Sequence, residues 1–159
     1  MAEAGVRLPK IIGIIGGTGK EGKGLAYRWA RAGLQVVIGS RQYEKAQAAA
    51  AEVNALLGGV TQVGAAVNAE AAETADLLVL TVPYAAHADM CQFIKSYAQG
   101  KIVIDVTVPL VPPKVTRVQL PPEGSATRQA QLILGDQVQV VAAFQNISYE
   151  HLLNDEPVD

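Results

Sequence analysis

The sequence contains very little cysteine, with Cys91 as its one thiol in 159 residues. A single thiol cannot close an intrachain disulfide, and it cannot supply several cysteine ligands to a metal ion. We therefore expect no metal site. Cys91 is interpreted as a core thiol of a protein in a reducing compartment, and the expected location is the cytoplasm.

The chain also has almost no excess of charge of either sign. It contains 13 Lys and Arg residues and 15 Asp and Glu residues, which gives a net charge of −2. This balance creates no basic field that would attract a polyanion, and we expect no nucleic-acid partner. No apolar run approaches the roughly 20 residues that cross a bilayer, and we expect no membrane partner. A length of 159 residues, half of them hydrophobic, predicts one compact domain over residues 1–159.

Short, β-branched apolar runs alternate with segments of helical spacing along most of the chain. Strands are predicted at residues 11–15, 36–38, 61–65, 77–80, 102–104 and 138–142, of which the third is the weakest. Helices are predicted at residues 20–32, 43–57, 69–74, 85–98 and 125–134. Runs of this kind are typical of strands buried on both faces. The alternation predicts an α/β fold, a doubly wound parallel sheet of the Rossmann type with strand order 3-2-1-4-5-6. The proline-rich stretch at residues 108–122 predicts a long loop near the ligand crevice.

Glycine gathers between the first predicted strand and the first predicted helix, where Gly17, Gly19 and Gly22 stand in the G-x-G-x-x-G register. We expect Gly17 to permit the tight turn, Gly19 to let backbone amides approach a pyrophosphate, and Gly22 to let the helix pack closely. The alternative is a sharp turn without a ligand, but the flanking strand and helix favour an anion site at the helix N-terminus. The candidate cofactor-binding residues of this loop are Gly16, Gly17, Thr18, Gly19, Lys20, Glu21 and Gly22.

The end of the second predicted strand carries Ser40 and Arg41, where an NAD-binding domain usually has a carboxylate for the ribose hydroxyl. Lys45 follows one helical turn further on. A guanidinium, an ammonium and a hydroxyl can bind the 2′-phosphate that a carboxylate would repel, so this segment predicts NADP(H) rather than NAD. The alternative is that both cations are only solvated, although cations are disfavoured at the start of a helix.

Residues 16–24, residues 37–41 with Lys45, and residues 80–83 resemble the NADPH-dependent reductases of the deazaflavin coenzyme F420. The resemblance spans nearly all of the chain. It implies that Thr18, Ser40, Arg41 and Lys45 clasp the 2′-phosphate. It also implies direct hydride transfer between NADPH and coenzyme F420 without an obligatory side-chain acid or base, and we therefore expect no catalytic residue.

The resemblance further implies that Thr81, Val82 and Pro83, after the fourth predicted strand, pack against the nucleotide. Val108 is an additional candidate cofactor contact, and it stands where many relatives carry an asparagine. Gln145 and Asn146 stand where relatives often carry a His-Thr or Asn-Thr pair on the deazaflavin side. His87 is a candidate for a proton or phosphate contact, but we interpret it as a capping or surface histidine.

Members of this family continue beyond the position of Asp159 with segments that cover the second ligand. The chain is therefore interpreted as an excised nucleotide domain, a short relative, or a protein that completes its site with another subunit. Open sheet edges favour a homodimer. Two other functions remain open, an NADP(H)-binding sensor or interaction domain without turnover, and the nucleotide domain of a metalloreductase or a pyrroline-carboxylate reductase.

Overall fold

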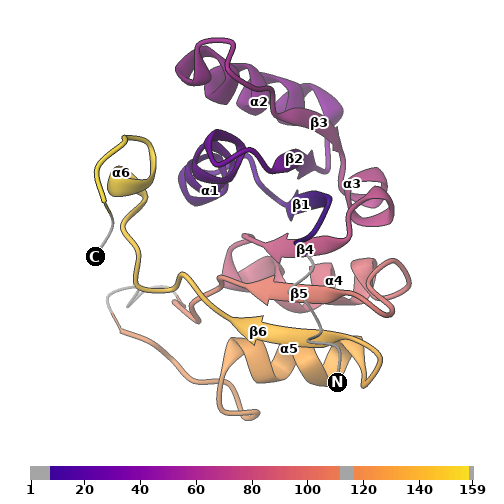
Figure 1. The fold of residues 1–159 in the computed structure, drawn as a ribbon. Helices are drawn as coiled ribbons and strands as arrows, with labels where there is room; N and C mark the ends of the chain where they lie inside the picture. The colour runs from indigo at the N-terminus through magenta and orange to yellow at the C-terminus, as the bar shows by residue number, and fades with distance from the viewer. Residues whose placement is uncertain (1–7, 112–116, 158–159) are drawn as a thin grey trace, which may run out of the picture.

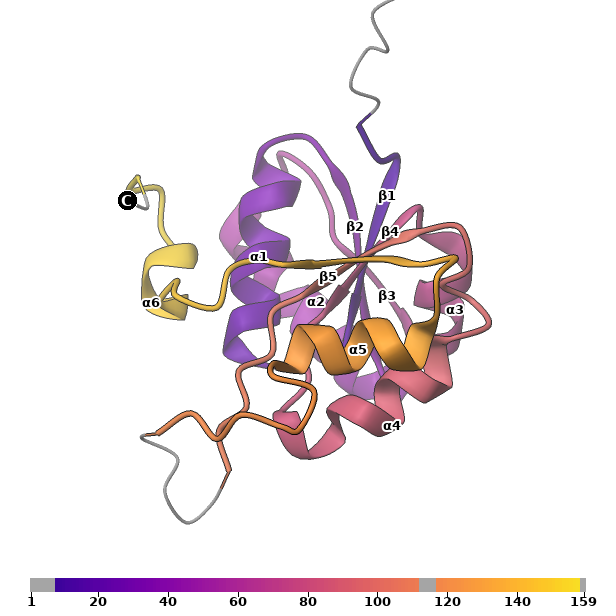
Figure 2. The ribbon, with the colours of Figure 1, turned by 90° about the horizontal axis from the view of Figure 1, so that it is seen from below.

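A computed structural model describes residues 8–111 and 117–157, which form a parallel sheet between two layers of helices (Figures 1 and 2). The strands are β1 (Ile11–Ile15), β2 (Gln35–Ser40), β3 (Gly64–Val67), β4 (Leu77–Leu80), β5 (Ile102–Asp105) and β6 (Gln139–Ala142). The helices are α1 (Lys20–Arg31), α2 (Tyr43–Leu57), α3 (Asn68–Thr74), α4 (Tyr84–Ile94), α5 (Ala126–Leu134) and α6 (Tyr149–Leu152).

Every strand pair in the sheet is parallel, and the order is β3-β2-β1-β4-β5-β6. The predicted Rossmann-type fold class and strand order are therefore confirmed. The chain leaves β1 toward β2 on one side and returns through β4 on the other, so the carboxyl ends of β1 and β4 flank the point where the strand order reverses. Ligands of such sheets bind at this point.

Each face of the sheet has its own hydrophobic core. Ile12 and Ile14 of β1 pack with α1, α2 and α6, whereas Ile15 and the β4 residues Leu78 and Leu80 pack with α3, α4 and α5. The alternation of side chains along a strand explains this division, since neighbouring residues point to opposite faces. The sheet thus buries both faces near β1 and β4 and holds their ends in place.

Strand β6 departs from the prediction of burial on both faces, because Gln139, Val141 and Ala142 are exposed. It is an edge strand, and α5 packs against the face that carries Val140. Val141 points to the opposite face and is 46% exposed. Within the described residues no helix covers that face of β6.

Most elements lie within two residues of their predicted bounds, and three differ from the prediction by more than that. Strand β3 begins at Gly64 rather than at residue 61, because the backbone of Val63 is hydrogen-bonded to the side chain of Asn54 instead of to a strand. Helix α4 ends at Ile94 rather than at residue 98. The amides of Tyr97 and Ala98 both donate hydrogen bonds to the carbonyl of Ile94. Helix α6 was not predicted.

The predicted proline-rich loop is irregular in its described parts, apart from a β-bridge between Leu110 and Val118. Residues 112–116 of that prediction lie outside the described residues. The helices of the described ranges are all too short or too polar to cross a membrane.

Candidate functional site

Two adjoining clefts lie at the carboxyl ends of the strands, where the strand order reverses. The larger cleft has a volume of about 940 Å³ and lies between the end of β2 and helix α4. The smaller cleft has a volume of about 440 Å³ and lies between the glycine loop and the turns after β4 and β5. Both contain Gly16, Thr18, Val82 and Pro83, so one extended ligand can occupy the two clefts together.

The glycine loop that joins β1 to α1 forms the wall shared by the two clefts. Gly17 was expected to permit the tight turn, and the residue of this loop with a left-handed backbone is Gly16, with φ of +69°. Gly17 instead lies against Ile14, where an added Cβ would stand 2.8 Å from its Cγ2. A Cβ on Gly22 would stand 2.6 Å from the Gly17 backbone, so Gly22 permits the predicted close packing.

Gly19 faces open space and is the N-cap of α1, with no side-chain cap. The first amides of a helix have no partner within the helix, and they carry partial positive charge. Gly19 and Glu21 line the smaller cleft, which therefore begins at this helix N-terminus. The arrangement provides donors for an anionic ligand, as the glycine spacing predicts.

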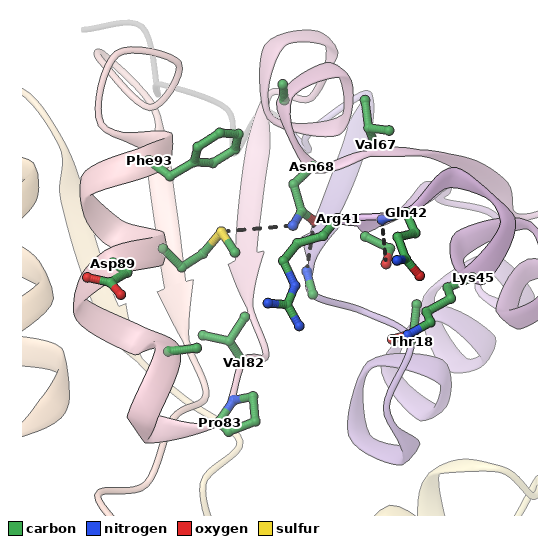
Figure 3. Close-up of a pocket in the computed structure, with 15 residues that line it drawn as sticks. Thr18, Arg41, Gln42, Lys45, Val67, Asn68, Val82, Pro83, Asp89 and Phe93 are labelled. Atoms are coloured by element: carbon green, nitrogen blue, oxygen red, sulfur yellow. Dashed lines mark hydrogen bonds between the residues drawn. The ribbon is translucent and has the colours of Figure 1, made fainter.

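Ser40, Arg41 and Lys45 come together in the larger cleft with Thr18, as predicted. In Figure 3, Arg41 extends into this cleft, with Lys45 and Thr18 on one side and Val82 and Pro83 on the other. Arg41 and Lys45 are exposed, and neither forms an ion pair with a described residue. The carboxylate of Asp89 also lines this cleft, but it lies on α4, on the other side of the cleft from Lys45 (Figure 3). Two cations that line one end of a cleft favour an anionic ligand there.

Thr81 and Val108 line the smaller cleft, which places these predicted residues on the far side of the glycine loop from Arg41. The amide and the hydroxyl of Thr81 both donate to the carbonyl of Ile15, at 3.1 and 3.2 Å. The turn after β4 is therefore fastened to the end of β1. Val108 offers an apolar surface without a donor or acceptor on its side chain.

Lys20, Gly17 and Gly22 line neither cleft. The Lys20 ammonium donates to the hydroxyl of Tyr149 at 3.1 Å and lies over its ring, and this hydrogen bond raises the pKa of Lys20. Gly17 and Gly22 pack against each other on the side of the loop that faces away from the clefts. All other predicted cofactor-binding residues line one cleft or both.

Glu21 brings a carboxyl group to the smaller cleft. Its Oε1 atom is buried and has no hydrogen-bond partner among residues 8–111 and 117–157, and burial raises the pKa of this carboxyl. A carboxyl group with a raised pKa can keep its proton and donate it to a ligand oxygen, or accept a hydrogen bond from a ligand hydroxyl when ionised. The described part of the chain has no cluster of three His, Cys, Asp or Glu residues suited to a metal ion.

Asn68, which the sequence analysis missed, is a buried polar residue of the larger cleft. Its Oδ1 accepts a hydrogen bond from the Gly16 amide at 3.1 Å, and its Nδ2 lies 3.9 Å from the sulfur of Met90 (Figure 3). It therefore connects the start of α3 to the glycine loop and to α4. The one available signal was a polar residue directly after an apolar strand, at the edge where ligands bind.

His87, Gln145 and Asn146 were discussed as candidates in the sequence analysis, and the structure contradicts the interpretation of His87. His87 is fully buried, so its interpretation as a capping or surface histidine is wrong, and it forms an ion pair or hydrogen bond with Asp105. Gln145 donates to the Asp105 carbonyl at 2.8 Å and so fastens the end of β6 to the end of β5. Asn146 is exposed.

Comparisons with known proteins place this chain beside one group of reductases. Residues 11–109 match the model of the family described as NADP oxidoreductase, coenzyme F420-dependent. The chain is 44% identical over 154 residues to the F420-dependent NADP reductase of Methanothermobacter thermautotrophicus, covering 93% of this chain and 66% of that protein. It is 37% identical over 155 residues to the protein of that name from Methanocaldococcus jannaschii, covering 93% and 69%.

Among solved structures, the chain is similar to an Arthrobacter protein assigned as an F420-dependent NADP reductase. The TM-score is 0.71 at 28% sequence identity, over 90% of this chain and 65% of that one. The chain thus spans about two thirds of the length of the relatives that it matches.

Proposed function

Because the chain belongs to the family of coenzyme F420-dependent NADP oxidoreductases, we propose that it transfers a hydride between NADPH and coenzyme F420. The proteins from Methanothermobacter and Methanocaldococcus carry the name F420-dependent NADP reductase, which supports this reaction over a binding domain without turnover. The same names disfavour the metalloreductase and pyrroline-carboxylate reductase alternatives.

The observation that carries the choice of NADP(H) is the pair of exposed cations in the larger cleft, Arg41 and Lys45, neither of which forms an ion pair with a described residue. They would bind the 2′-phosphate together with the hydroxyls of Ser40 and Thr18. A guanidinium can donate two parallel hydrogen bonds to a phosphate, and the ammonium adds a third donor. The larger cleft would therefore hold the adenosine end of the cofactor.

The glycine loop would bind the pyrophosphate through the backbone from Gly16 to Gly22, with Lys20 and Glu21 at its helical end. Thr81, Val82, Pro83 and Val108 would then enclose the nicotinamide in the smaller cleft. NADPH supplies the hydride when it is bound. The protein binds the two ring systems, aligns them and excludes water, and alignment alone can account for a large part of the rate acceleration.

Residues 1–159 would act as one nucleotide-binding domain, since the described strands form one sheet with helices on both faces. The exposed edge strand β6, with Val141 46% exposed, supports a homodimer, which sedimentation equilibrium would detect as twice the mass of the chain.

The cytoplasm is the compartment that we propose, because Cys91 is a free, buried thiol.

The reaction is tested by mixing the protein with NADPH and oxidised coenzyme F420 and following the loss of visible absorbance of the deazaflavin. We expect turnover with NADPH and much less with NADH. NADPH binding without any reduction of coenzyme F420 at high protein concentration would disprove the proposed activity and leave only a binding domain.

The phosphate contact is tested separately with Arg41→Ala. Loss of one charge-assisted hydrogen-bonding group should cost about 1.5 to 3 kcal/mol, or roughly tenfold or more in NADPH affinity, and should leave NADH affinity unchanged. Arg128→Ala is the matched control, because Arg128 is exposed on α5 and lines neither cleft. Equal losses for both nucleotides in Arg41→Ala would contradict the assignment.

A further inference from the structure

A buried pair of titratable side chains lies behind the smaller cleft and has no part in the binding roles given above. His87 of α4 and Asp105 at the end of β5 are both 0% exposed, and Nε2 of His87 lies 3.1 Å from Oδ2 of Asp105. Removing two such groups from water is costly, and their mutual contacts offset this cost only when the geometry is good. The pair therefore needs an explanation beyond general stability.

The second carboxylate oxygen of Asp105 connects the His87–Asp105 pair to residues that line the smaller cleft. Oδ1 accepts a hydrogen bond from the Thr107 amide at 3.1 Å, and the Thr107 hydroxyl donates to the Val82 carbonyl at 3.3 Å. Val82 belongs to the turn after β4, from which the chain enters α4 and returns to His87. These contacts form a closed ring that joins the turn after β4 to the turn after β5.

Both turns line the smaller cleft, through Val82 on one side and Thr107 and Val108 on the other. The distance between them sets the width of the cleft at the end that is remote from the phosphate-binding cations. A ring system bound there would be oriented by this width. The phosphates of the cofactor would lie along the glycine loop and at Arg41 and Lys45, so the affinity for NADPH would depend mainly on those residues.

The His87 ring is fully buried, and Tyr84 and Cys91 lie near it besides Asp105. The Tyr84 ring lies 6.0 Å away between centroids, and the Cys91 sulfur lies 4.0 Å from Nε2. Nδ1 is buried and has no hydrogen-bond partner among the described residues, so a proton on Nε2 leaves only a lone pair unsatisfied. Nε2 then donates to Asp105, and the ring cannot rotate without losing this bond.

We propose that His87 and Asp105 are positioning residues that hold the turns after β4 and β5 at the spacing required for hydride transfer. This inference rests on the reaction proposed above. Misplacement of reacting groups by about 1 Å can reduce a rate roughly a hundredfold, so a small change in the width of the smaller cleft would be visible in the rate.

The test compares His87→Leu with His87→Gln, whose amide nitrogen can donate in place of Nε2. In His87→Leu we expect the single-turnover rate of hydride transfer to fall about tenfold or more, with the NADPH dissociation constant within about threefold of the wild type. His87→Gln should recover most of the lost rate. Equal rates in the wild type and His87→Leu would overturn the inference, and so would parallel losses of rate and affinity.

Asn54→Ala is the matched control for a loss of buried hydrogen bonds. Asn54 makes two hydrogen bonds to the Val63 backbone at the end of α2 and lines neither cleft. This variant should lose stability without losing rate. A similar loss of rate in Asn54→Ala would show that general destabilisation explains the effect, and would also overturn the inference.

The fluorescence of bound NADPH separates this inference from the proposed reaction. If the wild type binds NADPH and does not reduce coenzyme F420, the proposed reaction fails. The emission and anisotropy of the nicotinamide then test the remaining part of the inference, that His87 and Asp105 orient the bound nicotinamide ring. A change in His87→Leu that is absent in Asn54→Ala supports it, and identical emission overturns it. If His87→Leu does not fold, Thr107→Val takes its place, because it removes only the hydroxyl bond to Val82 and should alter the same readouts.

Discussion

At the scale of single residues, two glycines of the glycine loop lack a Cβ atom for different structural reasons. Gly22 lies so close to the Gly17 backbone that a Cβ would approach it to 2.6 Å, whereas a Cβ on Gly19 would meet nothing within 4 Å. Gly19 also has φ of −76°, which any residue can adopt. One glycine is therefore required by packing, and the other leaves room for a ligand.

This contrast predicts opposite effects for two alanine substitutions. Gly22→Ala should destabilise the protein by about 1 to 3 kcal/mol, because the loop and α1 must move apart. Gly19→Ala should leave the melting temperature nearly unchanged and weaken NADPH binding, because its methyl group occupies space needed by the pyrophosphate. Thermal unfolding and NADPH titration of both variants check this, and equal melting temperatures would contradict the packing role of Gly22.

At the scale of elements, α6 shows how a segment can be helical only because of where it docks. It has four residues, and a helix of that length is not stable by itself. Leu152 is 4% exposed and packs against Gly24 of α1, while Arg28 of α1 donates to the carbonyls of His151 and Leu152. The segment after β6 thereby closes the core on the α1 side.

Leu152→Ala should therefore lower the free energy of unfolding by about 2 to 5 kcal/mol, the usual cost of truncating a buried leucine. Leu132→Ala on α5 is the control, since Leu132 is 61% exposed and its truncation should change stability by less than about 0.5 kcal/mol. Urea unfolding of both variants gives the two values. Similar values would show that α6 does not contribute to the folded core.

At the scale of the whole molecule, stability depends on two cores that share one sheet. Cys91 lies in the core on the α4 side and is fully buried. Burial, together with the charge of Asp105, raises the pKa of its thiol from 9.0 to about 12. In the unfolded chain the thiol ionises near its ordinary pKa, so between pH 9 and 12 the folded state retains a proton that the unfolded state has lost.

Since the folded state binds more protons there, stability must fall as the pH rises above 9, by up to about 1.4 kcal/mol for each pH unit from this group. Below pH 9 the thiol is neutral in both states and contributes no pH dependence. Urea unfolding of the wild type and Cys91→Ala from pH 8 to about pH 10.5 checks this prediction, because the variant removes the thiol and keeps every other titrating group. A stability difference that is constant over this range would contradict it.

Local pattern was sufficient for much of the molecule. The type and order of all six strands and five of the helices follow from apolar spacing, and the confirmed strand order follows from the right-handed connections of parallel strands. The predicted Ser40, Arg41 and Lys45 meet Thr18 in one cleft because residues at the ends of neighbouring parallel strands share an edge.

Only the tertiary structure decided which surfaces meet. The burial of His87, the hydrogen bond from the Gly16 amide to Asn68 and the existence of α6 each depend on partners far away in the chain. The exposure of Val141 reflects the lack of a covering helix among the described residues. The spacing of apolar residues shows which face of a helix or strand is buried. It does not show which other element packs against that face. For this protein, the sequence by itself determined the Rossmann fold and the glycine loop, whereas only the tertiary structure decided that His87 of α4 meets Asp105 of β5 behind the smaller cleft, because the two residues belong to separate elements.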